Sequence, residues 1–139
     1  MGLILDTSVL IAAERRRFRL TDLFTAYPNE RFFISAITAT ELLHGVERAA
    51  PPERKTTRSA FVEQLLSLLE AIDYDLAIAR RHATLWALLE QNGSIIGPYD
   101  LLIAATALEH NHQIATLNLS EFRRVPALPL IDTAPFTDL

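Results

Sequence analysis

The sequence predicts an α/β fold, a three-layer α/β/α sandwich with a short, mainly parallel central sheet. Short apolar runs alternate along the chain with longer segments whose apolar residues recur at helical spacing. The helical segments are long enough for right-handed crossovers, the connections that join parallel strands. We therefore expect helices on both faces of one sheet and a single domain over residues 1–139.

The first half of the chain predicts two strands and three helices. Residues 3–6 form an apolar run that is typical of a buried strand, and residues 31–36 are rich in aromatic and branched side chains. Helices are expected after each of these strands and once between them, over 7–17, 21–26 and 38–48.

The second half predicts further helices separated by short extended segments. The helix that begins at Pro98 is almost wholly apolar and should be buried on most sides, and Trp86 is expected in the core. The expected helices are 52–69, 76–90, 98–110 and a short turn at 120–124. The expected extended segments are 71–73, 114–117 and 128–131.

Composition narrows the classes of protein and of site. Half of the 139 residues are hydrophobic, which excludes a disordered chain. No apolar stretch reaches the roughly 18 residues that span a bilayer, and the amino terminus lacks a signal-peptide pattern. We expect a soluble, cytoplasmic protein without membrane contact. The chain has no cysteine, so a metal would take oxygen ligands or histidine, which favours Mg²⁺ or Mn²⁺.

Acidic and amide side chains recur at probable strand ends and helix starts. These residues are Asp6, Glu41, Asp100, Asn118 and Glu121. Ligands of open parallel sheets bind in the crevice beyond the carboxyl ends of the strands, where we expect these side chains to converge. Converging carboxylates raise one another's pKa and are stable as anions mainly with a cation between them.

Each acid also has a purely structural interpretation. Asp6 is placed to cap the helix that follows it. Thr38 and Glu41 have the spacing of a capping box. Asp100 falls in a first helical turn, where the helix dipole favours an acid. Convergence at one edge of the sheet would favour a site, because independent caps need not meet.

Four short motifs, in this order, resemble those of the PIN-domain ribonucleases, most of all the VapC-like toxins of type II toxin–antitoxin systems. The motifs are Asp6-Thr7-Ser8, Thr40-Glu41-Leu42 with Gly45, Asp100-Leu101-Leu102-Ile103-Ala104-Ala105, and Thr116-Leu117-Asn118 with Glu121-Phe122. Each motif is weak alone, and the set in order is specific. The resemblance covers essentially the whole chain.

The resemblance implies a divalent-metal-dependent endoribonuclease that cleaves single-stranded or looped RNA, commonly transfer RNA. The implied catalytic residues are Asp6, Glu41, Asp100 and Glu121. Asp6 and Asp100 are the expected ligands of Mg²⁺ or Mn²⁺. The implied supporting residues are Thr7, Ser8, Thr116 and Asn118.

The fourth acidic position departs from the family pattern. The family often has aspartate two residues after Thr116, where this chain has the neutral Asn118. Glu121 lies one helical turn further on, so either Glu121 supplies the charge or the site has one anion fewer. Since a missing carboxylate weakens a hard-cation site, we predict one well-occupied metal ion, and a second only when RNA phosphates contribute ligands.

The resemblance also implies protein partners. A cognate antitoxin would hold the toxin inactive, and homodimers are common in the family. Helices at 20–27 and 61–69 carry more apolar surface than a small core requires, which predicts a groove for an amphipathic segment or for a second copy.

Two alternatives to a ribonuclease stay open. A phosphatase with an aspartate nucleophile would also place Asp6 after the first strand, but that chemistry normally has a second aspartate where Ser8 stands. The other alternative is a catalytically weak PIN-fold module that binds a protein partner. Arginines gather in local clusters, including Arg15-Arg16-Arg17 and Arg123-Arg124, that could contact phosphates or form solvated surface.

Overall fold

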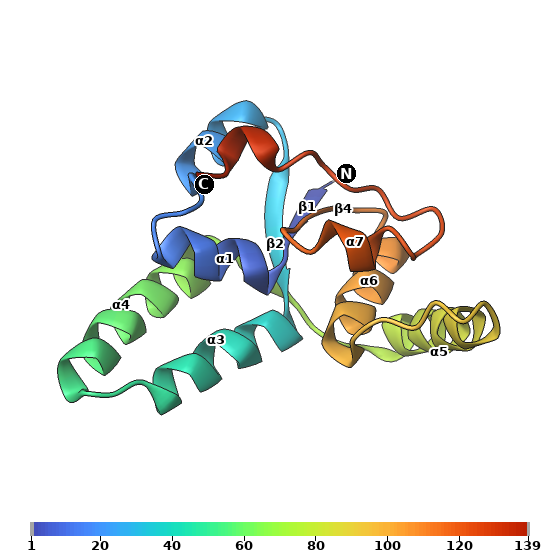
Figure 1. Cartoon of the computed structure of the whole chain (residues 1–139), viewed down its shortest axis with the longest axis horizontal. Coiled ribbons are helices and arrows are strands. Elements are labelled where there is room, and N and C mark those ends of the chain that lie inside the picture. Colours follow the sequence, from blue (N-terminus) through green and yellow to red (C-terminus); the bar gives the residue numbers. More distant parts are fainter. Residues whose placement is uncertain (1, 139) are drawn as a thin grey trace.

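The computed structural model describes residues 2–138, and its parallel sheet and flanking helices confirm the predicted α/β sandwich. One four-stranded sheet has the order β3-β2-β1-β4, and each neighbouring pair is parallel. The strands are β1 (Gly2–Leu5), β2 (Arg31–Ser35), β3 (Glu70–Ile72) and β4 (Gln113–Ala115). The first strand of the chain therefore lies inside the sheet, beside the last (Figure 1).

Helices cover both faces of this sheet. Side chains of α1, α2, α3 and α4 pack on one face, and those of α5, α6 and α7 pack on the other (Figure 1). The helices are α1 (Thr7–Glu14), α2 (Leu20–Ala26), α3 (Ala36–Arg48), α4 (Pro52–Leu68), α5 (Leu76–Gln91), α6 (Pro98–His110) and α7 (Leu119–Phe122). A 3₁₀ turn, η1 (Ala134–Phe136), packs beside α2.

Strand β1 shows how the sequence pattern produces the two packed layers. Leu3 and Leu5 point into the cluster under α1 and α4, whereas Ile4 points into the cluster under α5 and α6. All three side chains are fully buried, as expected for an inner strand of a parallel sheet that is covered on both faces. Asp6 follows directly at the carboxyl end of this strand.

The boundaries of two helices differ from the predicted ones. Helix α1 ends at Glu14, with Arg15 as its carboxyl-terminal cap, rather than at Arg17. Helix α3 begins at Ala36 because the Ser35 hydroxyl accepts a hydrogen bond from the Thr38 amide at 3.2 Å. The predicted capping box of Thr38 with Glu41 is therefore wrong, and the Glu41 carboxylate is free for another role.

Two further expectations are corrected. Residues 128–131 do not form a strand: Leu130 makes a single bridge to Ile114 at the edge of β4. Trp86 is not a core residue, because half of it is exposed on α5, where it stacks on His82. The buried residues of α5 are Ile78, Leu85 and Leu89, and Trp86 lies outside this buried stripe. Within residues 2–138, no helix is long and apolar enough to cross a membrane.

Candidate active site

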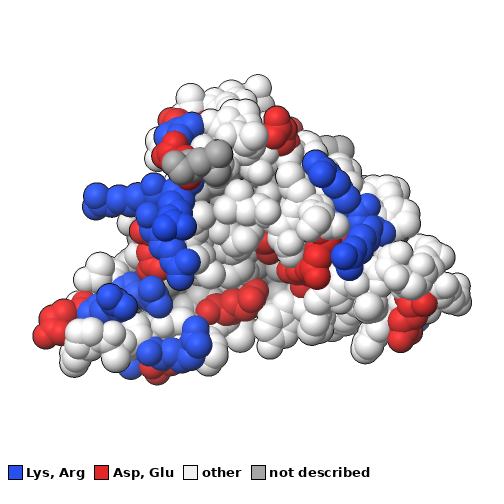
Figure 2. All heavy atoms as spheres, viewed as in Figure 1, with Lys and Arg blue, Asp and Glu red and all other residues white. Residues whose placement is uncertain are grey.

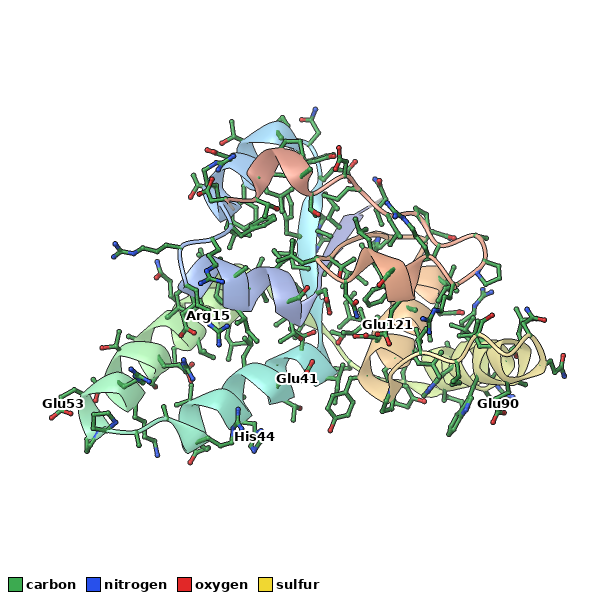
Figure 3. The ribbon with its side chains drawn as sticks, viewed as in Figure 1. Arg15, Glu41, His44, Glu53, Glu90 and Glu121 are labelled. Atoms are coloured by element: carbon green, nitrogen blue, oxygen red, sulfur yellow. The ribbon has the colours of Figure 1, made fainter. Side chains whose placement is uncertain are left out.

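Four acidic side chains from four distant segments lie at the carboxyl edge of the sheet. Asp6 follows β1, Glu41 is on α3, Asp100 is in the first turn of α6, and Glu121 is on α7. Figure 3 shows Glu41 and Glu121 on opposite sides of the region where β1 and β2 end. The parallel topology produces this convergence, because the strands all end at the same edge.

Asp6 is fixed by hydroxyl groups from two segments. Its Oδ2 accepts hydrogen bonds from the Ser8 hydroxyl at 2.6 Å and from the Thr116 hydroxyl at 2.8 Å. The Asp6 side chain makes no capping bond to α1, so the cap interpretation does not hold. Only 3% of Asp6 is exposed, and among the described residues no hydrogen bond reaches its Oδ1. One oxygen is thus held in place while the other is free to bind a ligand.

Glu41 is joined to the start of α1 through Thr7. The Thr7 hydroxyl donates to Glu41 Oε1 at 2.7 Å, and it lies 3.1 Å from the hydroxyl of the fully buried Thr38. The Glu41 carboxylate therefore points back toward the sheet edge, as the sequence predicts. Thr7 supports Glu41, while its neighbour Ser8 supports Asp6.

Asn118 and Glu121 both occupy the fourth position of the site. The Asn118 amide nitrogen donates to Asp100 Oδ2 at 3.0 Å and to Glu121 Oε2 at 2.8 Å. The backbone amide of Asn118 donates to the Thr116 hydroxyl at 2.9 Å. The Asn118 amide thus bridges the two acids, and the structure places both Asn118 and Glu121 beside Asp100.

The Asp100 carboxyl is the electrostatically unfavourable member of the group. Burial raises its pKa to about 7, together with its hydrogen bond to Glu121 and the charges of Asp6 and Glu121; the Asn118 amide acts in the opposite direction. The same hydrogen bond to Asp100 lowers the pKa of Glu121. The two carboxyl groups therefore titrate as a coupled pair, in which Asp100 holds a proton more readily than Glu121 does.

The donor set suits a hard divalent cation. None of the described lysine or arginine side chains forms an ion pair with any of the four acids. Across residues 2–138, no three histidine or acidic side chains are arranged to hold a metal ion. Carboxylates without ion-pair partners nevertheless match the oxygen ligands that Mg²⁺ or Mn²⁺ prefers, and a bound cation would favour the anion of Asp100 that burial and the neighbouring acids disfavour.

The structure brings together all eight residues that the sequence predicts and adds two more. Thr38, assigned to a cap, contacts Thr7. A Cβ atom at Gly97 would lie 3.8 Å from Asp100 Oδ2 and 3.9 Å from Glu121 Oε2, so this glycine borders both carboxylates. The Gly97-Pro98 pair just before Asp100 is a signal that could have identified it.

The histidines of the second half of the chain serve the fold. His112 Nδ1 accepts a hydrogen bond from the Gly2 amide at 2.9 Å, and its ring stacks on Phe33. The His82 ring lies 3.0 Å from the Tyr74 hydroxyl and stacks on Trp86. Neither contact involves the acidic cluster.

Fold and acidic edge together define a PIN domain: the chain belongs to the PIN domain family, whose model matches residues 3–128. It is similar to Ribonuclease VapC of Rickettsia bellii, with 36% identity over 99% of this chain and 100% of the relative. It is also similar to the tRNA(fMet)-specific endonuclease VapC of Salmonella typhimurium, with 37% identity over 85% of this chain and 82% of the relative. Among solved structures, VapBC2 from Rickettsia felis bound to a promoter DNA fragment contains a chain with a TM-score of 0.85 and 32% identity, covering 94% of this chain and 98% of that one.

Proposed function

We propose that this protein is a divalent-metal-dependent endoribonuclease and the toxin of a toxin–antitoxin pair. It cleaves single-stranded or looped RNA by hydrolysis of phosphodiester bonds. The observation that carries this proposal is the convergence of Asp6, Glu41, Asp100 and Glu121 at one edge of the sheet, with no ion pair to any of them among residues 2–138. Similarity to VapC ribonucleases over almost the full chain supports the choice of RNA.

Asp6 and Asp100 are the residues that would hold Mg²⁺ or Mn²⁺. Such an ion neutralises the phosphate charge and lowers the pKa of water, which is the chemistry that phosphodiester hydrolysis needs. Ser8 and Thr116 fix one oxygen of Asp6 and leave the other for coordination. Thr7 holds Glu41 where its second carboxylate oxygen can orient the attacking water.

Asn118 and Glu121 position Asp100 rather than compete for one role. Both of their side chains contact the Asp100 carboxyl, which limits the rotation of that group. The site then offers two well-placed ligands from the chain, Asp6 and Asp100. A single firmly bound ion follows, and a second would depend on oxygens from the RNA phosphate.

Transfer RNA is the first substrate class to examine. Two similar relatives, from Salmonella typhimurium and Shigella flexneri, are named tRNA(fMet)-specific endonucleases. An exposed, open edge of the sheet suits a flexible loop better than a base-paired stem, because unstacked nucleotides can bend into the site. The expected cleavage is therefore in a loop of a cytoplasmic transfer RNA.

The antitoxin is the proposed protein partner. The solved relatives from Rickettsia felis and Salmonella typhimurium are VapBC complexes. A groove of about 570 Å³ runs between α2 and α4 and is lined by Phe24, Phe61, Leu65 and Leu68, among others. Leu68 is 66% exposed, so an amphipathic antitoxin segment would cover apolar surface that the fold leaves open.

A homodimer is proposed through a different surface. Tyr74, Leu76 and Trp86 each expose half or more of their surface at the start of α5 and along it. This apolar group is separate from the α2–α4 groove, so dimer formation and antitoxin binding need not exclude each other. The sequence left both uses open for the surface of residues 20–27 and 61–69; the proposal keeps the antitoxin there and assigns the dimer to the surface at α5.

Cleavage by site variants tests the proposed activity. The purified protein, Asp6→Asn and Asp100→Asn would be incubated with transfer RNA in Mg²⁺ or Mn²⁺, and the new RNA ends sequenced. We expect cleavage by the unaltered protein, loss in EDTA, and loss of about a hundredfold or more in each variant. Glu90→Gln, at an exposed acid far from the site (Figure 3), is the matched control and should cleave normally. Circular dichroism would verify folding, and full activity in either aspartate variant would disprove the site.

A further inference from the structure

The cationic side chains of this protein divide into paired and unpaired groups. Of its thirteen lysines and arginines, five form ion pairs with acids among the described residues. The paired residues are Arg19, Arg31, Lys55, Arg58 and Arg81. Several of the remaining arginines are exposed at the borders of the acidic site, where ion pairs within the described chain do not account for them.

One group, which we call the α1 flank, consists of Arg15, Arg16 and Arg17 just beyond the end of α1. These arginines line a hollow of about 780 Å³ together with Ser8, the residue whose hydroxyl binds Asp6. Arg15 also lines a second, smaller hollow together with Glu41. The same helix thus begins at the acidic site and ends at the α1 flank, about 12 Å away for eight residues at 1.5 Å each.

The second group, the α7 flank, consists of Arg123 and Arg124 just after α7. They follow Glu121 within one helical turn. Arg124 Nη1 donates to the Ile95 carbonyl at 3.0 Å, which fixes the guanidinium while most of its five N–H donors stay free. The Arg124 charge contributes to the lowered pKa of Glu121, so it acts on the site itself.

The acidic cleft lies between these flanks. Figure 2 shows acidic surface in the middle of this face with basic surface on both sides of it. Figure 3 places Arg15 beyond Glu41 on one side and Glu121 on the other. Because the chain has a net charge of −4 and the cleft repels phosphate, bulk electrostatics would not hold RNA here, and only local cations can.

We propose that the α1 flank and the α7 flank bind backbone phosphates on opposite sides of the scissile bond, so that the RNA strand crosses the acidic cleft from α7 to the end of α1. This inference rests on the proposed ribonuclease function and names the groups that hold its substrate. Arginine suits this role because its planar guanidinium binds phosphate oxygens in pairs.

The alternation of charge distinguishes RNA from an acidic protein segment. An acidic peptide laid across both flanks would place carboxylates against Asp6, Asp100 and Glu121, none of which forms an ion pair within the described chain. An RNA strand places there the one phosphate whose charge the metal ion would neutralise. The flanks bind phosphate, so they favour no base and leave sequence selection to other surfaces.

Equilibrium binding without cleavage tests this path. The probe is a fluorescein-labelled single-stranded RNA of about 12 nucleotides, within the usual range of single-strand sites. Binding is followed by anisotropy in EDTA at several salt concentrations, in an Asp100→Asn background. Replacement of all three arginines of the α1 flank by Gln, or of both in the α7 flank, should weaken binding about tenfold at low salt. The slope of log K against log salt should become shallower by about 0.7 for each phosphate that the variant no longer binds.

Matched variants separate position from charge. Arg54→Gln with Arg80→Gln removes two exposed, unpaired arginines that line neither hollow, and should leave the affinity and the slope nearly unchanged. Lysine at the flank positions keeps the charge and should restore most of the slope. Flank variants that bind RNA like this control would overturn the proposal, including the case in which the flanks bind an acidic protein instead.

The binding experiment and the cleavage experiment fail independently. If the protein shows no metal-dependent cleavage of RNA, the proposed function is wrong. The anisotropy measurement in EDTA involves no cleavage, so it tests the path of the RNA separately. In the Asp100-containing protein, the flank variants should raise KM for RNA while kcat changes little, because they act on binding remote from the reacting phosphate. A loss confined to kcat would also contradict the assignment.

Discussion

The two sides of the acidic site differ in how they hold a carboxylate and in how stable its anion is. On one side, Asp6 is almost fully buried and accepts hydrogen bonds from two hydroxyl groups, those of Ser8 and Thr116. On the other side, Asp100 is partly buried beside Glu121, and its pKa is raised to about 7. The first side holds a carboxylate in a fixed position, and the second holds one that is unstable as an anion until positive charge arrives.

The two sides therefore have different roles: the Asp6 side fixes the position of a carboxylate, and the Asp100 side determines the affinity of the site for a cation. Hydroxyl donors stabilise an anion and orient it at low cost, so Asp6 is prepared before any ligand binds. Burial of Asp100, together with its hydrogen bond to Glu121 and the charges of Asp6 and Glu121, disfavours the Asp100 anion in the folded protein, and a bound cation would offset this. The Asp6 side should therefore govern the geometry of catalysis, and the Asp100 side should govern how strongly the site depends on metal and on pH.

Among changes to the residues that support the acids, removing the Thr116 hydroxyl should produce the largest effect. Thr116→Val keeps the shape of a fully buried side chain. It removes one hydrogen-bond donor to Asp6 and the acceptor of the hydrogen bond from the Asn118 backbone N–H. We expect RNA cleavage to fall about 10- to 100-fold. Thr7→Val, which removes the donor to Glu41 instead, is the comparison variant and should lose less.

Initial cleavage rates at saturating Mg²⁺ would measure both threonine variants, with thermal unfolding as the test of folding. Equal losses in the two variants would show that positioning is spread evenly over the site. The conclusion that the Asp6 side governs the geometry of catalysis would then be wrong.

Converting the bridging amide to an acid should have the next largest effect. Asn118→Asp replaces the donor between Asp100 and Glu121 by a third carboxylate. Affinity for Mn²⁺ should increase about tenfold, equivalent to about 1.4 kcal/mol, because each added carboxylate strengthens a hard-cation site. Isothermal titration calorimetry would measure the affinity and the number of ions, and Asn118→Ser is the uncharged control. Weaker binding in the aspartate variant would refute the assignment of this side as the cation-dependent one.

The smallest expected effect is on the pH dependence of stability in the metal-free protein. The folded pKa of Asp100 lies above its value in an unfolded chain, so the folded state loses stability as the pH rises from about 4 to about 7. Asp100→Asn removes this loss. In EDTA the variant should match the unaltered protein near pH 4 and exceed it above pH 7 by about 1 kcal/mol, a figure reduced for partial exposure and for the opposing shift at Glu121.

Urea unfolding at several pH values would measure the stability of Asp100→Asn and of the unaltered protein. Asp22→Asn, at an exposed salt-bridged acid, is the control. A pH-independent difference between Asp100→Asn and the unaltered protein would show that Asp100 is not destabilised as an anion.

The positions of Asp6, Thr116 and Asp100 could be predicted from the parallel direction of the strands and from the spacing of apolar residues. Asp6 and Thr116 each follow a short apolar run, and parallel strands bring such positions to one edge. Asp100 lies in the first turn of an apolar helix whose start is signalled by Pro98. These inferences need only the backbone, which the spacing of apolar residues determines well.

The parts that could not be predicted depend on side-chain geometry in three dimensions. Asn118 bridges Asp100 and Glu121 through rotamers that no sequence spacing reveals. Ser35 caps α3 in place of Thr38 because two good capping residues compete three positions apart, and the strand end decides between them. Trp86 lies outside the buried stripe of α5 although it is the largest apolar side chain nearby.

The adjacency of β1 and β4 has a consequence for biosynthesis. Asp6 receives the Thr116 hydroxyl from 110 residues further along, and the Asn118 bridge to Asp100 also comes from the late part of the chain. A nascent polypeptide that has emerged only as far as α6 carries three of the acids but neither the Thr116 donor that fixes Asp6 nor the pair that fixes Asp100. The acidic edge can therefore be completed only after β4 and α7 have emerged from the ribosome, and it cannot be assembled before then.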